Sequence, residues 1–214
     1  MAIAQDLPVP LPVASLLLVH GAGSGPQIFE RWPRHFPGLD VDAVDLHAGL
    51  VVARASMRNY AAAVSARANL LPAPRAICGW SMGGLAAMMS ADLAGAARLV
   101  LLEPSAPAEV LGVHDGPALE EGTFDPVEVY GRPPEGVEMR PESTLARAER
   151  KRGISVLGLP CPALVVYGDE YPDERGRPIA ARYGADEEHF PGLDHLGLVL
   201  DASVPAAVSD WLDA

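Results

Sequence analysis

The sequence contains few cysteines, and their placement limits the class of protein. Cys78 and Cys161 are the only two in 214 residues, and neither belongs to a Cys-x-x-Cys or Cys/His pattern. Both lie in apolar, strand-like stretches, which is typical of buried, reduced thiols. The pattern argues against a disulfide scaffold and a metal site, and it favours a cytoplasmic protein that binds no metal.

Lysine is scarcer still, and the balance of charge is strongly acidic. Lys151 is the only lysine beside fifteen arginines, and the formal net charge is −12. Such a chain is repelled by polyanions, so we expect neither nucleic acid nor an anionic membrane surface as a partner. One basic cluster, residues 147–152, lies on an expected helix. We interpret it as a solvated helix face, with a patch for an anionic substrate or partner as the alternative.

Long apolar runs are also missing. The longest apolar stretches are much shorter than the roughly 20 residues that a membrane-spanning helix needs. Residues 1–19 have no basic start and include Asp6 and several prolines, which argues against a signal peptide. Hydrophobic residues nevertheless make up 49% of the chain, enough to fill one core. We expect a single soluble domain over residues 1–214.

Short apolar stretches alternate with helical patterns along the chain. Strand-like segments cover residues 14–19, 41–46, 75–79, 99–102, 163–167 and 188–190. Helical patterns cover residues 28–36, 57–71, 82–94, 142–152 and 177–183, and a last helix ends near Leu212. Pro33 is expected to distort or end the first of these helices. Ser56 is a candidate cap for the second, whose apolar face includes Tyr60. This alternation predicts right-handed βαβ crossovers and an α/β fold with an open, mainly parallel sheet flanked by helices. Ligands of such sheets bind beyond the carboxyl ends of the strands.

The regular pattern stops after the fourth strand and returns before the fifth. Residues 105–141 are rich in proline, glycine and glutamate, and residues 142–152 look helical. Compact domains rarely carry a long irregular stretch without a functional reason. We therefore expect a small lid at about residues 105–152.

The segment Gly79-Trp80-Ser81-Met82-Gly83 joins a predicted strand to a predicted helix. A serine on so sharp a turn has a strained backbone, and a side chain two residues away on either side would collide with the turn. Glycines at these positions remove the collision and leave the serine hydroxyl exposed. In this context the segment resembles the nucleophile elbow of the α/β-hydrolase family. The resemblance implies that Ser81 is a catalytic nucleophile.

A serine nucleophile requires a base within hydrogen-bonding reach. His195 lies in the loop 191–197, between the last predicted strand and the last helix, and this loop resembles the one that carries the family's catalytic histidine. We therefore expect His195 to be the base. His189 lies inside a predicted strand and is interpreted as structural. His47 follows a strand, so a role in the substrate wall is an alternative for it.

The third member of the triad is expected between Ser81 and His195, after the fifth strand. In the family an acid usually stands three residues after the glycine that ends this strand, but here Tyr171 occupies that position after Gly168. Asp169 lies nearest the strand end and is our first choice. Asp173 and then Glu103, at the end of the fourth strand, are the alternatives.

The motif His20-Gly21-Ala22-Gly23 follows the first strand. In the family such a motif supplies one backbone N–H of the oxyanion hole, and the residue after the nucleophile supplies the other. The resemblance therefore implies that Ala22 and Met82 are the oxyanion-hole donors. His20 itself is expected to hold the loop.

Together these motifs predict a serine hydrolase of the carboxylesterase type. It would cleave a small-molecule ester or related acyl bond through an acyl-enzyme, with no metal or organic cofactor. Two alternatives stay open. A thioesterase would act on a carrier-bound acyl group, for which the basic cluster 147–152 offers a docking patch. A ligand sensor on the same fold would keep the triad without turnover. The sequence specifies neither the acyl group nor a protein partner.

Overall fold

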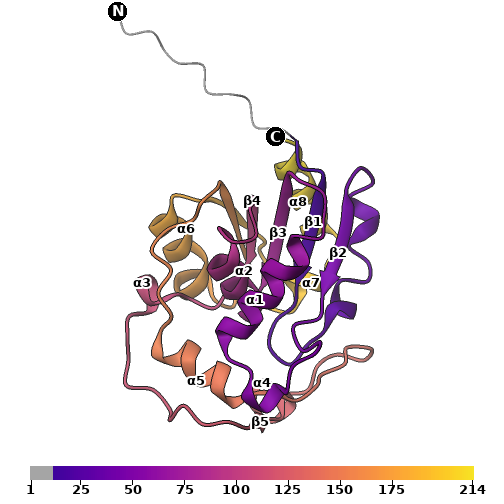
Figure 1. Ribbon diagram of the computed structural model, residues 1–214. Helices are drawn as coiled ribbons and strands as arrows, with labels where there is room; N and C mark the ends of the chain where they lie inside the picture. Colours follow the sequence, from indigo (N-terminus) through magenta and orange to yellow (C-terminus); the bar gives the residue numbers. More distant parts are fainter. Residues whose placement is uncertain (1–11) are drawn as a thin grey trace, which may run out of the picture.

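A six-stranded parallel sheet forms the centre of the computed structural model, which describes residues 12–214 (Figure 1). Across the sheet the strands are β2 (Asp40–Val44), β1 (Ser15–Val19), β3 (Arg75–Trp80), β4 (Ala96–Leu102), β7 (Ala163–Tyr167) and β8 (Asp186–His189). Every pairing within this sheet is parallel, so all six carboxyl ends meet at one edge. The predicted α/β architecture is confirmed.

Helices and short helical turns cover both faces of the sheet (Figure 1). One face carries α1 (Met57–Ala68), α2 (Met82–Ser90) and α6 (Arg177–Tyr183), and the other carries η1 (Pro26–Phe29), η2 (Pro33–His35), α7 (Gly197–Leu200) and α8 (Ser203–Asp213). Alternate side chains of β1 belong to the two layers, with Leu17 in the first and Leu16 in the second. Burial on both faces explains why these strands are almost continuously apolar.

Helix α1 begins where the sequence predicts a cap. Ser56 and Asn59 form a capping box, in which the Ser56 hydroxyl accepts a hydrogen bond from the Asn59 N–H and the Asn59 side chain accepts one from the Ser56 N–H. A cap of this kind contributes about 1 kcal/mol. Tyr60, Val64 and Ala68 then recur every four residues on the buried face. The cap and the apolar stripe together fix the position of Tyr60.

Some predicted helices differ from the structure. The helix expected through Ile28, Trp32 and Phe36 is replaced by the two 3-10 turns η1 and η2, because Pro33 cannot continue a helix. All three side chains are nevertheless buried. The helix expected from Glu142 begins two residues later, because Glu142 and Ser143 form a short strand.

Residues 105–152, named here the excursion, lie beyond the carboxyl ends of the strands (Figure 1). The excursion contains α3 (Ala108–Leu111), β5 (Thr123–Phe124), α4 (Pro126–Tyr130), β6 (Glu142–Ser143) and α5 (Thr144–Arg152). Strands β5 and β6 pair antiparallel in a sheet of their own. Two further turns, η3 (Val52–Arg54) and η4 (Pro172–Gly176), border the same edge. Of the helices within residues 12–214, none has the length and apolar character to cross a membrane.

Candidate active site

Ser81 lies on the turn between β3 and α2 in a strained backbone conformation. Its φ is 56° and its ψ is −120°, a backbone conformation that residues other than glycine rarely adopt. A Cβ atom at Gly79 would lie 2.5 Å from the carbonyl oxygen of Gly83, and one at Gly83 would lie 2.3 Å from that of His20. The two glycines therefore allow the turn in the way that the sequence predicts.

Glu103 directly follows the neighbouring strand β4 and is the other non-glycine residue with a positive φ within residues 12–214. Its side chain is completely buried. One carboxylate oxygen accepts a hydrogen bond from the Gly168 N–H at 2.8 Å, and the other lies 2.6 Å from Nδ1 of His195. A buried carboxylate needs such partners, because it has lost its hydration.

Three further contacts hold the loop that carries His195. The Trp80 indole N–H donates to the His195 carbonyl at 3.0 Å, and the His195 N–H donates to the Glu170 carboxylate at 2.9 Å. The Tyr171 ring lies edge-on to the imidazole, with ring centroids 5.5 Å apart. Because Glu103 can only accept while ionised, Nδ1 carries the proton and Nε2 is left as the basic nitrogen.

The acid expected after β7 makes different contacts. Asp169 is exposed, and its two oxygens accept hydrogen bonds from the His189 ring and the Gly192 N–H, each at 2.8 Å. These contacts lower the pKa of Asp169, with the Gly192 hydrogen bond contributing most. Asp173 pairs with Arg177 at 2.6 Å. The structure therefore corrects our first choice of partner for His195: the residue in contact is Glu103, our last choice.

Ser81 and His195 line the same cavity, which has a volume of about 820 Å³. Ala22 and Trp80 contribute from the strand ends, and Tyr130 and Arg150 contribute from the excursion. Cavities of this size hold small organic ligands. The hydrogen bonds within residues 12–214 do not include one between Ser81 and His195. In ligand-free enzymes, catalytic hydrogen bonds are often long or poorly aligned and tighten when substrate binds.

The two expected oxyanion-hole residues lie next to the elbow. Ala22 lines the cavity, and Met82 is the first residue of α2. Within the described part of the chain, neither of their N–H groups donates a hydrogen bond to another backbone or side-chain atom. The structure thus leaves two backbone donors unpaired close to Ser81.

The fold has counterparts among solved structures, although no protein-family model and no curated protein matches this chain. One of the metagenome-derived lipolytic enzymes LipS and LipT is 21% identical, with a TM-score of 0.64 over 97% of this chain and 99% of the other. Polyneuridine aldehyde esterase is 17% identical, with a TM-score of 0.61 over 94% and 98%. The pyrethroid hydrolase PytH is 16% identical, with a TM-score of 0.63 over 94% and 98%. This chain has the α/β-hydrolase fold.

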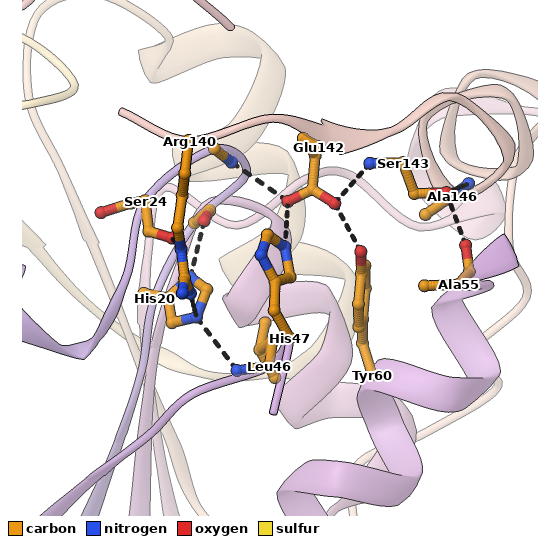
Figure 2. A network of polar contacts seen from close by, with 12 residues as sticks. His20, Ser24, Leu46, His47, Ala55, Tyr60, Arg140, Glu142, Ser143 and Ala146 are labelled. Carbon is orange, nitrogen blue, oxygen red and sulfur yellow. Dashed lines mark hydrogen bonds and ion pairs between the residues drawn. The ribbon is translucent and has the colours of Figure 1, made fainter. Parts of the chain in front are cut away.

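Within this α/β-hydrolase fold, a second polar cluster lies against the loop that carries Ala22. Figure 2 shows Tyr60, His47 and Ser143 directed toward the carboxylate of Glu142, which is completely buried. Hydrogen bonds reach Glu142 from the Tyr60 hydroxyl at 2.5 Å, the Ser143 N–H at 2.7 Å, the Gly23 N–H at 3.1 Å and the His47 ring at 3.2 Å. Burial raises the pKa of Glu142, but the hydrogen bonds from His47 and Tyr60 outweigh it and lower the pKa to about 2.

Arg140 holds the same loop from a second direction (Figure 2). Its guanidinium donates to the Ser24 carbonyl at 2.7 Å and forms two hydrogen bonds with Asp45, at 3.1 and 2.5 Å. Its backbone N–H donates to the Gly23 carbonyl at 2.8 Å. Both polar groups of the Gly23 backbone are therefore bound by the excursion.

The two histidines of this cluster are structural in their contacts. His20 is buried, its Nδ1–H donates to the Gly21 carbonyl at 2.9 Å, and its Nε2 accepts from the Leu46 N–H at 3.1 Å. It holds the loop, as expected. His47 is paired with Glu142 and does not belong to the lining of the cavity that holds Ser81. The alternative of a substrate-wall role for His47 is therefore not met.

Sequence reasoning missed Glu142 and Tyr60. Tyr60 follows the buried face of α1, so its burial was expected, but the target of its hydroxyl was not. Glu142 stands at the end of an irregular, charged stretch, where an exposed side chain is the ordinary expectation. A local signal for this cluster is absent from the sequence, because its members come from four separate parts of the chain.

Proposed function

We propose that this protein is a serine hydrolase that cleaves a carboxylic ester or related acyl bond through an acyl-enzyme. Ser81 is the nucleophile, His195 the general base and Glu103 the acid that orients the base. The observation that carries the proposal is the 2.6 Å contact between the buried Glu103 carboxylate and Nδ1 of a histidine that shares a cavity with the elbow serine.

In the first step, the Ser81 hydroxyl oxygen attacks the carbonyl carbon of the ester while Nε2 of His195 accepts the hydroxyl proton. The imidazole becomes a cation, and Glu103 stabilises it through the Nδ1–H hydrogen bond without taking the proton. Burial strengthens this support, because a carboxylate shielded from water acts through a lower dielectric than an exposed one. Asp169, which is exposed, has no comparable position.

The tetrahedral intermediate carries its negative charge on the former carbonyl oxygen. The Ala22 and Met82 N–H groups are the proposed donors to this oxygen, and the loss of one such donor typically costs about 3 kcal/mol in the transition state. His195 then gives its proton to the leaving alkoxide, which departs as the alcohol. A water molecule, deprotonated by His195, hydrolyses the acyl-enzyme and restores Ser81.

An acid at the end of β4 can replace one at the end of β7 because the two strands are hydrogen-bonded neighbours. Their carboxyl ends lie side by side, so His195 can be reached from either. Gly168, at the end of β7, supplies its N–H to Glu103 and thereby links the two strand ends. A glutamate from β4 and an aspartate from β7 are alternative solutions to the same geometric requirement.

We further propose that the excursion, residues 105–152, is the lid of this site. Residues 1–214 then form one domain with a lid. Val129, Tyr130 and Met139 line the cavity from this segment and give it an apolar wall. Through Gly23 the same segment also binds the loop that carries Ala22. A lid attached in this way would shape the acyl pocket and support the oxyanion hole at once.

The test is fluorophosphonate labelling combined with turnover of short p-nitrophenyl esters and matched thioesters. We expect labelling and ester turnover by the wild-type protein, and for Ser81→Ala no labelling and a loss of at least about a thousandfold in kcat. Ser155→Ala, which changes an exposed serine outside the cavity, is the control. Labelling without turnover of any substrate would favour the ligand sensor. A strong preference for thioesters would favour the thioesterase.

A further inference from the structure

Arg150 of α5 brings a guanidinium group with unused donors to the cavity that holds Ser81. Its Nη1 donates to the Ser105 hydroxyl at 3.2 Å. Its Nε and Nη2 are buried and have no hydrogen-bond partner within residues 12–214. Buried cationic donors are rarely left without an acceptor, so the missing partner calls for an explanation.

The two unpaired nitrogens form one edge of the guanidinium. Nε–H and one N–H of Nη2 point in parallel directions, and this edge matches the two oxygens of a carboxylate in a two-pronged hydrogen bond. The unused capacity of Arg150 therefore has the geometry of a carboxylate-binding group. A single neutral carbonyl would satisfy only half of it.

The other charged residues around the cavity also favour the binding of an anion. Arg132 and Arg175 also line it, and neither they nor Arg150 lie within 4.0 Å of a described carboxylate oxygen. The acidic residues of the lining, Glu170 and Asp194, instead accept hydrogen bonds from backbone N–H groups. Although the net charge of the chain is −12, the arginines of the cavity thus lack carboxylate partners, whereas its two carboxylates already accept hydrogen bonds.

Arg150 is also linked to the nucleophile. The Ser105 hydroxyl that accepts from Arg150 belongs to the residue whose N–H donates to the Ser81 carbonyl at 2.8 Å. Two consecutive contacts therefore connect the guanidinium to the backbone of Ser81. An anion bound by Arg150 would lie on a molecule that extends from the reacting centre into the cavity.

We propose that Arg150 is an anion-binding residue and that the substrates are esters carrying a carboxylate, either on the acyl chain or on the leaving group. The substrate class rests on the proposed function, whereas the anion site does not. The free edge is buried, so binding requires the Arg150 side chain to rotate into the cavity that it already lines. The bound carboxylate would then supply the acceptors that the protein itself lacks.

Matched substrates test this proposal. p-Nitrophenyl hemisuccinate differs from p-nitrophenyl butyrate by a carboxylate in place of the terminal methyl group, and 4-acetoxybenzoate places the charge on the leaving group of phenyl acetate. We expect the wild-type protein to prefer one of the charged esters by about tenfold or more in kcat/KM. Arg150→Met should reduce that preference at least about tenfold, and Arg150→Lys should fall between, because an ammonium lacks the two-pronged edge. Lys151→Met, on the same helix outside the cavity, should keep it.

A binding measurement separates this proposal from the proposed function. Succinamate and its neutral counterpart butyramide are titrated into Ser81→Ala with and without Arg150→Met, followed by tryptophan fluorescence, since Trp80 lines the cavity. We expect succinamate to bind at least about tenfold more weakly without Arg150. That result upholds the anion site even if no ester is hydrolysed.

Equal charge preference and equal succinamate affinity with and without Arg150 would overturn the anion site. Turnover of p-nitrophenyl butyrate would then still support the hydrolase. The melting temperature shows whether the variants fold. We expect Arg150→Met to melt no lower than the wild type, because it removes an unpaired buried charge. Should Arg150→Met fail to fold, Arg150→Lys carries the test, and an unchanged preference in that variant would count against the proposal.

Discussion

The structure contains two buried glutamate–histidine pairs, one at the cavity that holds Ser81 and one against the loop that carries Gly23, and they differ in what surrounds them. Glu103 and Glu142 are both completely buried. Glu103 contacts Nδ1 of His195 at 2.6 Å, whereas Glu142 contacts Nε2 of His47 at 3.2 Å. The side chain of His195 is 18% exposed and lines the cavity, while that of His47 is 8% exposed and does not.

The difference shows that residue types alone do not assign a catalytic role. Glu103 has one donor besides its histidine, and Glu142 has three, from Gly23, Tyr60 and Ser143. His195 uses Nδ1 for its glutamate, so its more remote nitrogen, Nε2, stays available to a substrate. His47 uses Nε2 for its glutamate. On the proposed mechanism the first pair moves a proton, whereas the second, which lies outside the cavity lining, holds the loop that carries Gly23.

The largest effect is expected from breaking the first pair. Glu103→Gln should lower kcat for ester hydrolysis about a thousandfold or more, because the amide supports neither the required tautomer nor the imidazolium of His195. Asp169→Asn should change kcat less than about threefold, since its partners are His189 and Gly192. The measurement is kcat over pH 5 to 9 for the two variants side by side. An inactive Asp169→Asn beside an active Glu103→Gln would restore the acid that the sequence favoured.

The candidate site could be predicted from the sequence where its causes are local. The elbow depends on glycines two residues from Ser81, and their steric effect is visible in a pentapeptide. Strand ends also gather predictably at one edge of a parallel sheet, which placed His195 near Ser81. The choice of acid was not local. Asp169 and Glu103 both follow buried strands, and backbone N–H groups of other loops, Gly168 for one and Gly192 for the other, set which carboxylate turns toward which histidine.

The second pair lay beyond prediction for the same reason. Tyr60 is 82 positions from Glu142 in the chain, His47 is 95 and Gly23 is 119. No periodicity connects such distant positions. The helical turns η1 and η2 illustrate a milder case, in which the buried side chains were predicted correctly while the proline changed the type of helix. Hydrophobic patterns thus predicted the layers, whereas these polar contacts depend on how distant loops pack against one another.

A smaller effect is expected from breaking the second pair. Glu142→Gln should lower the free energy of unfolding at pH 7 by about 3 kcal/mol, because the amide group turns a donor toward other donors in a buried site. The folded-state pKa of Glu142, about 2, lies below the ordinary glutamate value of 4.5. Its contribution is therefore fully present above about pH 4.5 and is lost as the pH falls toward 2.

Denaturant unfolding between pH 2 and 7 measures this effect. The wild-type stability should fall more steeply below pH 4.5 than that of Glu142→Gln, since only the wild type must protonate this carboxylate. Glu138→Gln, an exposed change in the same excursion, should follow the wild type. Parallel pH curves for the wild type and Glu142→Gln would contradict the assigned pKa. A loss of kcat in Glu142→Gln that approaches that of Glu103→Gln would remove the distinction between the two pairs.

The smallest effect is expected from removing only one of the four donors to Glu142, which sharpens the comparison between the two pairs. Tyr60→Phe should lower the free energy of unfolding by about 1 to 2 kcal/mol, since the carboxylate stays buried with its other three partners. Tyr183→Phe is the matched control, as it removes a hydroxyl that donates to the Val156 carbonyl at 2.6 Å outside this cluster.

A double-mutant cycle then decides whether Glu142 and its donors act as a unit. Combined with Glu142→Gln, Tyr60→Phe should add less than its single effect, by at least about 0.5 kcal/mol, because the two changes remove the same interaction. Combined with Glu142→Gln, Tyr183→Phe should add its full effect. If Tyr60→Phe were also fully additive, the short contact between the Tyr60 hydroxyl and Glu142 would contribute nothing to stability. The excursion would then hold the Gly23 loop through Arg140 rather than through the buried glutamate.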